Sequence, residues 1–284
     1  MKFNLSITAL VASVLLATNV EARWQPTPGL TWDYLLGAKD DVVKASKQQV
    51  VTFDLEQAER LVPYVHSKGQ KAICYFSGGT TEHRAYDREE YQKSGLALGG
   101  NGDDWGNQWL DIRNKAKLQP LIRKRMQRAR SYGCDAVEVD CLGIYHYRSD
   151  YTKEDSYVFA KWVAETAHQE GISIGLKNVA GIAESLEPYF DFAVVESCAK
   201  GNTCKNYKNF TQHQKAVFIV HYGESFTLSG SSLNTLIEAQ KGMHFTCVFS
   251  QNNKLHDNVT NYDCNSGSTI SGKNKKYGRI RNKR

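Results

Sequence analysis

The feature that most constrains this chain is a repeated alternation of short apolar runs with segments of helical periodicity. The apolar runs are almost uninterrupted by polar residues, as expected for strands of a sheet that is covered on both faces. They are residues 32–38, 50–54, 71–76, 135–140, 172–176, 192–196, 216–220 and 244–249. Apolar residues at helical spacing recur between them, at 58–65, 118–129, 159–167 and 233–237.

Strand–helix alternation predicts an α/β protein with a parallel sheet. Eight strands over this length predict one domain with the (β/α)₈ TIM-barrel architecture. A doubly wound open sheet is the alternative fold. Such sheets bind nucleotides through a G-x-G-x-x-G turn after an early strand, and GGTT at 78–81 lacks that spacing. The sequence therefore favours the barrel.

The two ends of the chain differ from its middle. Residues 1–22 combine a positive start, the apolar stretch LSITALVASVLLA and small residues before a cleavage site, which predicts a secretory signal peptide. That stretch is too short to span a bilayer. Residues 23–265 are expected to form the barrel, and 266–284 a basic, disordered tail. The tail could bind a polyanion, but it lacks any zinc-finger or aromatic-interleaved motif, so we expect a solvated tail and no nucleic-acid partner.

The composition agrees with a secreted globular protein. Hydrophobic residues make up 41% of the chain and there are only 5 prolines, which suffices for one large core. The formal net charge is +6. Asn209 and Asn258 stand in N-glycosylation sequons. We expect an extracellular monomer without a membrane partner.

Polar side chains end most of the predicted strands. In a TIM barrel the active site lies at the C-terminal ends of the strands. The residues at these ends are Asp54, Tyr75, Ser77, Asp140, Lys177, Asn178, Glu196, His221, Tyr222 and Gln251. Any one of them could simply cap the following turn, but carboxylates that close three different strands together indicate a site rich in acids.

Asp140 and Glu196 are the best catalytic pair among these residues. Each follows an apolar strand, and one strand separates the two. Two carboxylates on facing strands can cleave a glycosidic bond, one by protonating the departing oxygen and the other by attacking the anomeric carbon or activating water. Trp105, Trp109 and Tyr145 in the long loops could stack on sugar rings.

Other chemistries have weaker support. The 8 histidines show no metal-binding spacing, and the chain has no G-x-S-x-G elbow. A nucleophile built from Cys141 and His221 remains open, although Cys141 is more simply a buried thiol or a disulfide partner. We expect neither a cofactor nor a metal.

Six blocks of the chain form a recognisable series. They are WQPTPGLTWDYLLG (24–37), KAICYFSGGTTE (71–82), WLDIR (109–113), GCDAVEVD (133–140), GISIGLKN (171–178) and YFDFAVVESCAKGNTC (189–204). In these blocks, over about residues 24–264, the chain resembles glycoside hydrolase family 114. That family consists of secreted endo-α-1,4-polygalactosaminidases with a (β/α)₈ barrel. The resemblance implies a glycoside hydrolase whose substrate is a galactosamine-containing polysaccharide.

The resemblance also implies roles for individual residues. The family's strand-four motif E-P-D-N-V-D-G-Y places a catalytic Asp at Asp140, and its strand-six motif N-E-Q-C places the second carboxylate at Glu196. We predict Asp140 as nucleophile and Glu196 as acid/base. Substrate-binding positions that match the family are Asp54, Trp109, Asp111, Arg113 and Lys177. From the strand ends and adjoining loops we add Tyr75, Glu138, Tyr145 and Tyr222, with Glu138 on the same strand face as Asp140 and one step deeper.

The chain departs from the family pattern at several positions. In the strand-four motif Cys141, Gly143 and Ile144 replace Asn, Asp and Gly, and elsewhere Thr52, Val195 and His221 replace Asp, Asn and Glu. Three acids that could hold a cationic aminosugar are thus absent. We expect an altered sugar preference or reduced activity. The alternative is a catalytically impaired barrel that binds a polysaccharide or a protein.

The 7 cysteines predict disulfides in a secreted chain, with one thiol left over. The resemblance implies a disulfide between Cys198 and Cys204. For the remaining five, the pairs Cys74–Cys134 and Cys247–Cys264 are guesses that leave Cys141 as the free thiol.

Overall fold

The computed structural model describes residues 23–100, 102–103 and 105–271. The predicted signal peptide lies outside the described residues, as does the tail from residue 272 onward. The start of the predicted tail pairs with the sheet, because Thr269 forms an antiparallel bridge to Tyr262. Within the described residues, none of the helices is long and apolar enough to cross a membrane.

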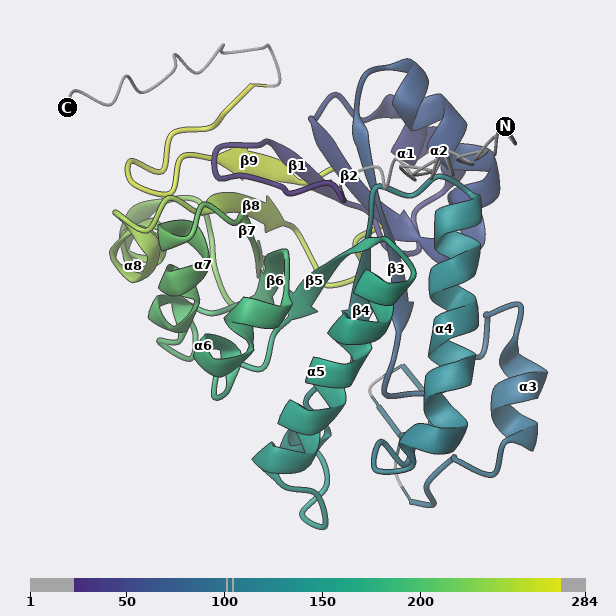
Figure 1. Cartoon of the computed structure of the whole chain (residues 1–284). Helices are drawn as coiled ribbons and strands as arrows, with labels where there is room; N and C mark the ends of the chain where they lie inside the picture. The colour runs from purple at the N-terminus through teal and green to yellow at the C-terminus, as the bar shows by residue number, and fades with distance from the viewer. Residues whose placement is uncertain (1–22, 101, 104, 272–284) are drawn as a thin grey trace, which may run out of the picture.

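The strands form one curved sheet in chain order, which confirms the TIM barrel (Figure 1). Consecutive strands from β1 to β8 pair in parallel, and β9 runs antiparallel to β8. The strands are β1 (Trp32–Tyr34), β2 (Val50–Asp54), β3 (Lys71–Ser77), β4 (Ala136–Asp140), β5 (Ser173–Lys177), β6 (Phe192–Glu196), β7 (Val217–Tyr222), β8 (Thr246–Ser250) and β9 (Thr260–Tyr262).

The strand β9, which the sequence analysis did not predict, helps to close the barrel. Asn261 accepts a hydrogen bond from the Trp32 amide at 3.0 Å and donates one to the Trp32 carbonyl at 2.8 Å. Its side-chain amide therefore bonds to β1 as a neighbouring strand would, and this joins the last strand to the first.

Helices surround the sheet (Figure 1). The four helical segments predicted from periodicity correspond to α2 (Ala58–Ser67), α4 (Lys115–Ser131), α5 (Lys153–Gln169) and α8 (Gly230–Gln240). The helices α1 (Asp40–Ala45), α3 (Arg88–Lys93), α6 (Ala183–Leu186) and α7 (Lys208–Gln212) are too short for periodicity to reveal. Four 3₁₀ turns complete the list: η1 (Leu55–Gln57), η2 (Ile144–His146), η3 (Glu187–Tyr189) and η4 (Cys204–Tyr207).

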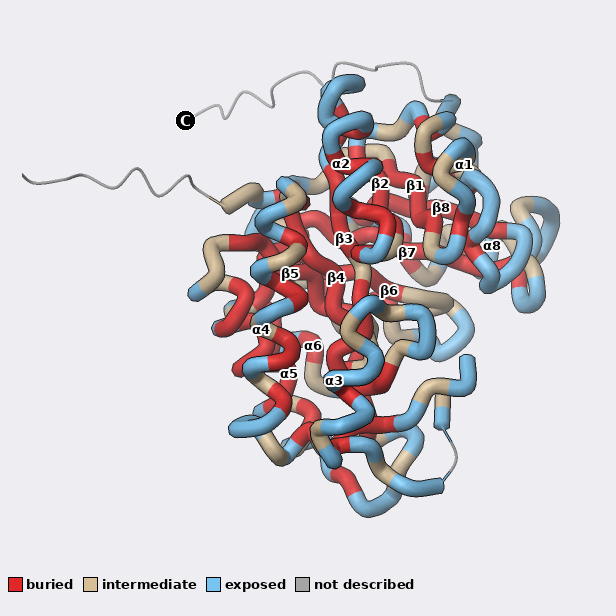
Figure 2. The backbone as a smooth tube through the Cα atoms, turned by 90° about the vertical axis from the view of Figure 1, so that its right-hand side faces the viewer, coloured by how far each residue is buried: buried red, intermediate tan, exposed pale blue. Residues whose placement is uncertain are grey.

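The core has two layers, which follow from the alternation of side chains along each strand. On β4, Val137 and Val139 pack outward against the helices, whereas Ala136 belongs to the cluster inside the barrel. Figure 2 shows the buried strands and the exposed outer faces of the helices. The inward-facing set on β4 continues to Glu138 and Asp140, so this strand directs two carboxylates toward the barrel axis.

Three disulfides link parts of the barrel. They are Cys74–Cys134, Cys198–Cys204 and Cys247–Cys264. Cys141 is the free cysteine among the described residues. All three predicted pairings are therefore confirmed.

Candidate active site

The ammonium group of Lys177 lies among three carboxylates at the C-terminal ends of β4, β5 and β6. Its Nζ atom is 3.0 Å from Asp140 Oδ2, 3.2 Å from Glu138 Oε1 and 3.3 Å from Glu196 Oε2. Lys177 is buried and Glu138 is fully buried, whereas the side chains of Asp140 and Glu196 are 22% and 30% exposed. The two predicted catalytic carboxylates are thus the ones that a substrate can reach.

The chain turns sharply directly after each of these three strands. Cys141, Asn178 and Ser197 have φ angles of 60°, 54° and 50°, in the left-handed region that non-glycine residues seldom adopt. The turn at Cys141 brings its amide to Asp140 Oδ1, where the N–H donates a hydrogen bond of 2.6 Å. Such backbone conformations persist only where surrounding contacts enforce them, and they are concentrated at functional sites.

Close backbone packing holds the end of β3 beside Asp140. The Gly78 amide donates to the Asp140 carbonyl at 2.9 Å. At Gly79 an ideal Cβ would lie 2.0 Å from the Cys141 carbonyl oxygen, so only glycine permits this approach. The Gly-Gly pair therefore lets the chain leaving β3 pass against the residue that follows Asp140.

Asp140 is held in its ionised form. Burial alone would raise its pKa, but the nearby Lys177 charge and the hydrogen bond from the Cys141 amide outweigh burial and hold the pKa of Asp140 below its usual value. The Tyr75 hydroxyl donates a further hydrogen bond to Asp140 Oδ2 at 2.9 Å. An ionised carboxylate fixed by several donors is what a glycosidase nucleophile requires.

Glu196 is held by different partners. Asn178 Nδ2 donates to Glu196 Oε2 at 3.0 Å, and Asn178 Oδ1 accepts a hydrogen bond from the Glu196 amide at 2.9 Å. The Tyr222 hydroxyl donates to the other carboxylate oxygen, Oε1. These contacts fix the carboxyl group while leaving it accessible from the barrel mouth.

Glu138 lies one step deeper than Asp140, as predicted. The Tyr34 hydroxyl donates to Glu138 Oε1 at 2.7 Å and accepts a hydrogen bond from Lys177 Nζ at 2.8 Å. Burial raises the pKa of Glu138 to about 7, against the opposing effect of Lys177. Because Glu138 is fully buried, it contacts the central site through Lys177 and Tyr34.

Asp54 lies beside this group, in a cavity of about 250 Å³. The same cavity is lined by Tyr75, Glu82 and Arg84. Asp54 Oδ2 accepts a hydrogen bond of 2.6 Å from the Gly37 amide, and burial raises the pKa of Asp54. Tyr75 borders this cavity and also bonds Asp140, so its side chain lies between the cavity and the central site.

The WLDIR residues lie outside the central group. Trp109 is buried and stacks on the exposed Tyr147, with ring centroids 4.8 Å apart. Asp111 accepts from the Tyr151 hydroxyl at 2.9 Å, and the Arg113 guanidinium lies over the Tyr151 ring at 4.1 Å. These contacts join the loop before α4 to the loop before α5. The expected role of the three residues in substrate binding stays a prediction.

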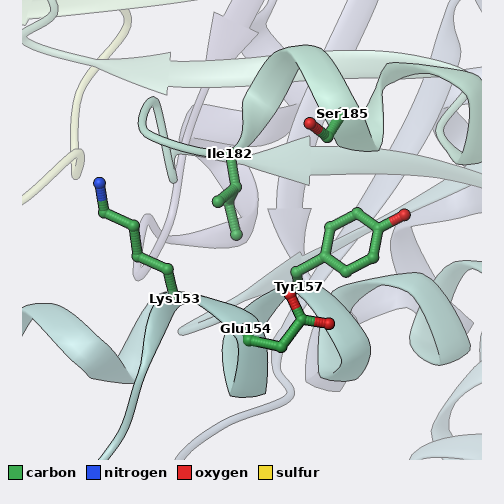
Figure 3. A pocket seen from close by; sticks show the side chains of 5 residues that line it. All are labelled: Lys153, Glu154, Tyr157, Ile182 and Ser185. Atoms are coloured by element: carbon green, nitrogen blue, oxygen red, sulfur yellow. The ribbon is translucent and has the colours of Figure 1, made fainter.

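Tyr145 also lies apart from the carboxylates, with its ring 4.0 Å from that of His146. An ideal Cβ on Gly181 would lie 3.2 Å from the Tyr145 hydroxyl and 3.4 Å from Lys153 Nζ, so both groups border the turn after β5. Lys153 in turn lines a cavity of about 240 Å³ between α5 and α6, together with Glu154, Tyr157, Ile182 and Ser185 (Figure 3).

Two of the substitutions relative to the family pattern do not face the barrel mouth. His221 is fully buried and contacts Gln240 of α8 at 3.3 Å and the ring of Phe226 at 5.1 Å. Val195 packs in the outer layer with the helices. The predicted place of His221 at the barrel mouth is wrong, because adjacent residues of a strand face opposite sides and Tyr222 takes the inward position.

At Gly143 the neighbouring turn fills the space that a side chain would need. An ideal Cβ there would lie 2.8 Å from Val179 Cγ1 and 3.2 Å from His146 Cδ2. The glycine in the strand-four motif is therefore matched to the turn after β5, since a side chain would displace Val179.

A cluster of possible metal ligands lies behind β7. Ligand atoms of Cys198, Cys204 and His221 are within 4.8 Å of one another. The two sulfurs are joined in a disulfide, so they are not thiolates, and thiolates are the form that binds metal. The chemistry of this donor set does not fit a metal ion.

Tyr34 is the functional-site residue that the sequence analysis missed. It bonds both Glu138 and Lys177, and its ring lies 4.7 Å from that of Trp32. A possible signal was the alternation of Trp32 and Tyr34 on the first strand, since inward-facing residues of a barrel strand are two apart. Asn178 was recognised at a strand end, but not as the partner of Glu196.

Two partly exposed carboxylates at the mouth of a TIM barrel are the arrangement that glycoside hydrolases use. Comparison with known proteins agrees, because the family model for glycoside hydrolase family GH114 matches residues 14–269. The chain belongs to this family. A search of curated protein sequences gives no match.

Solved structures of two related proteins resemble this one. Ega3 of Aspergillus fumigatus, in complex with galactosamine, is 29% identical with a TM-score of 0.73, and the match covers 84% of this chain and 98% of that one. The glycoside hydrolase domain of PelA from Pseudomonas aeruginosa is 14% identical with a TM-score of 0.59, and the match covers 81% and 96%. The PelA likeness shows the fold alone.

Proposed function

We propose that the protein is a secreted hydrolase of α-1,4-linked, galactosamine-containing polysaccharide, with Asp140 as nucleophile and Glu196 as acid/base. The contact of both carboxylates with Lys177 Nζ carries this proposal. Because Asp140 Oδ2 and Glu196 Oε2 lie 3.0 and 3.3 Å from the same nitrogen, they are at most about 6.3 Å apart. Retaining glycosidases hold their carboxyl groups about 5–5.5 Å apart and inverting ones about 6.5–9.5 Å. The upper bound on these two oxygens lies below the inverting range, which favours a retaining mechanism.

In the first step Asp140 attacks the anomeric carbon and Glu196 gives its proton to the departing glycosidic oxygen. The glycosyl group is then bonded to Asp140. In the second step Glu196 takes a proton from water, which attacks the same carbon and frees Asp140. Lys177, Tyr75 and the Cys141 amide stabilise Asp140 as the carboxylate in which the cycle begins and ends.

The choice of sugar rests on the family and on the galactosamine in the related Ega3 structure. The Asp54 carboxylate in the cavity beside Tyr75 supports a substrate with protonated amino groups. Secretion is supported by the three disulfides, which persist in oxidising compartments.

The test is turnover of α-1,4-linked galactosamine oligomers by the wild type, Asp140→Asn and Glu196→Gln. Asp140→Asn should abolish turnover, and Glu196→Gln should reduce it at least about a hundredfold because general acid catalysis is lost. Glu89→Gln is the control, since Glu89 is exposed on α3 and pairs with Lys93. Proton NMR of the first products should show the α anomer.

Equal turnover by all four proteins would contradict the catalytic assignment. First products with the β anomer would contradict retention. A wild type that binds the oligomers without cleaving them would identify the protein as a polysaccharide-binding barrel.

A further inference from the structure

Lys177 contacts two carboxyl groups that need opposite protonation states, Asp140 and Glu196. A lysine ammonium group favours the ionised form of any carboxyl group beside it. That suits the nucleophile Asp140, which must be ionised. It opposes the acid/base Glu196, which must carry a proton when the reaction begins, and whose Oε2 atom lies only 3.3 Å from Lys177 Nζ.

Glu138 is a third carboxyl group beside Lys177, and its negative charge can offset that of the ammonium group. It is fully buried, it lies 3.2 Å from Lys177 Nζ, and it is out of reach of a substrate. One carboxylate oxygen, Oε1, accepts from the Tyr34 hydroxyl, which itself accepts from Lys177. The other, Oε2, has no hydrogen-bond partner among the described residues. Burying a carboxyl group with one oxygen unpaired costs free energy. Its presence here therefore calls for a functional explanation.

We propose, on the basis of the proposed function, that Glu138 is a positioning residue that holds Lys177 between Asp140 and Glu196 and offsets its positive charge. One lysine can then keep Asp140 ionised without removing the proton from Glu196. Tyr34 forms hydrogen bonds with both Glu138 and Lys177, and so fixes how deep in the barrel the ammonium group lies.

The other titratable groups around Lys177 and Glu138 do not provide this offset. Burial raises the pKa values of Tyr34, Tyr75 and Tyr222 well above the usual value, so these tyrosines are neutral donors. Asp140 contacts Lys177 but must itself stay ionised. The carboxylate of β2, Asp54, lines the adjoining cavity and bonds the Gly37 amide, and β8 contributes the uncharged Val248 to the barrel interior. Glu138 is thus the remaining carboxylate that can balance Lys177.

The offset also adjusts itself to pH. Since burial raises the pKa of Glu138 to about 7, Glu138 gains negative charge as the pH rises through the neutral range. The offset is therefore fully present above about pH 7 and weakens as the pH falls below it.

The test compares the pH dependence of kcat/KM in the wild type, Glu138→Gln and Lys177→Met. The alkaline limb of this profile reports loss of the proton from the acid/base group. Glu138→Gln keeps the side-chain shape but removes the negative charge, so the alkaline midpoint should move down by about one pH unit. Lys177→Met removes the positive charge, so the midpoint should move up by about one pH unit.

A second readout does not depend on turnover. In protein labelled with ¹³C at the glutamate side-chain carboxyl carbons, the Glu196 signal, assigned with Glu196→Gln, is followed during a pH titration. Its midpoint should move in the same two directions. Glu138→Asp, which keeps the charge, should restore most of the wild-type midpoint, and it serves as the second variant if Glu138→Gln does not fold. Asp33→Asn is the matched control, because it removes a buried carboxylate on β1 that bonds Ser46 and does not contact Lys177.

Midpoints that stay in place, or that move the same way in Glu138→Gln and Lys177→Met, would overturn the proposal. A role in folding alone would lower activity at every pH without moving the limb. If the wild type has no turnover, the proposed function fails, while the Glu196 titration still decides whether Glu138 offsets Lys177.

Discussion

At the scale of single residues, the site depends on which side of a strand each side chain faces. His221 and Tyr222 are neighbours on β7, but Tyr222 bonds the carboxylate of Glu196 whereas His221 lies behind the strand against Gln240 and Phe226. A family position that changes from Glu to His therefore changes the packing of the outer layer. It leaves the charge at the barrel mouth unaltered.

The burial of His221 predicts a pH dependence of stability. Burial lowers the pKa of His221 to about 4, so the folded protein keeps this histidine neutral at pH values where the unfolded chain protonates it. Stability from this group is complete above about pH 6.5 and is lost as the pH falls toward 4. Between pH 7 and 4.5 the wild type should lose about 2 kcal/mol more free energy of unfolding than His221→Gln.

Urea unfolding of both proteins at several pH values measures this difference. The comparison cancels the pH dependence of all other groups, because they are shared. If the unfolding free energies of the wild type and His221→Gln change with pH in parallel, His221 does not titrate as inferred.

At the scale of elements, a buried arginine fixes α4 to the end of β3 and to the loop that follows. Arg125 donates to the Ser77 carbonyl at 2.9 Å and to Asp87 at 2.8 and 2.7 Å, and it also pairs with Glu82. Its guanidinium lies 4.1 Å from the centroid of the Tyr91 ring of α3. Because Glu82 also lines the cavity beside Asp54, this arginine holds one wall of that cavity in place.

Replacing Arg125 by Met should therefore destabilise the protein strongly. The change leaves two largely buried carboxylates without their cation, and breaking a buried ion pair in this way costs about 3–5 kcal/mol. Lys124→Met is the matched control on the same helix. Lys124 pairs with Glu90, and the two side chains are 61% and 45% exposed, so its loss should cost less than about 1 kcal/mol.

Chemical denaturation of the two variants gives both values. Losses of equal size would mean that the Arg125 cluster is held by other contacts. The loop between β3 and α3, which holds Glu82 and Asp87, should also become more sensitive to proteolysis in Arg125→Met, because these two ion pairs order it.

At the scale of the whole molecule, disulfides and strand pairing keep the barrel closed. Cys74–Cys134 encloses a chain separation of 60 residues, which includes the long loop after β3 and all of α4. Cys198–Cys204 spans only 6 residues directly after β6. Cys247–Cys264 joins β8 to the segment after β9, next to the Asn261 side chain that bonds β1.

The stabilisation by each disulfide should follow the length of chain that it closes. In the chain-entropy description, closing loops of 60 and 6 residues adds about 4 and about 2 kcal/mol to the free energy of unfolding. Replacing both cysteines of the 74–134 pair by Ala should thus lower the free energy of unfolding more than replacing both of the 198–204 pair. Urea denaturation measures both, and a larger loss for the short loop would contradict the expectation.

Much of this protein was determined by the sequence itself. The eight apolar runs and the helical periods between them favoured a barrel, because strand–helix alternation covers both faces of a parallel sheet and no glycine-rich turn supported the doubly wound alternative. Asp140, Glu196 and Lys177 could be placed at the mouth because the direction of parallel strands fixes where their ends lie. The cysteine pairs likewise agreed with the structure.

Other features were decided only by the tertiary structure. Which of two adjacent residues faces the axis depends on how the strand is placed, and this separated Tyr222 from His221. The bond from Tyr34 to Glu138 joins residues 104 positions apart, and Asn261 closes the barrel against a strand 229 positions away. Such contacts leave no periodic trace in the chain, because they form only when the closed barrel brings β1 beside β9 and directs the side chains of β1 and β4 toward the same axis. The sequence placed the acids at the mouth, and the closed barrel put one buried lysine among them.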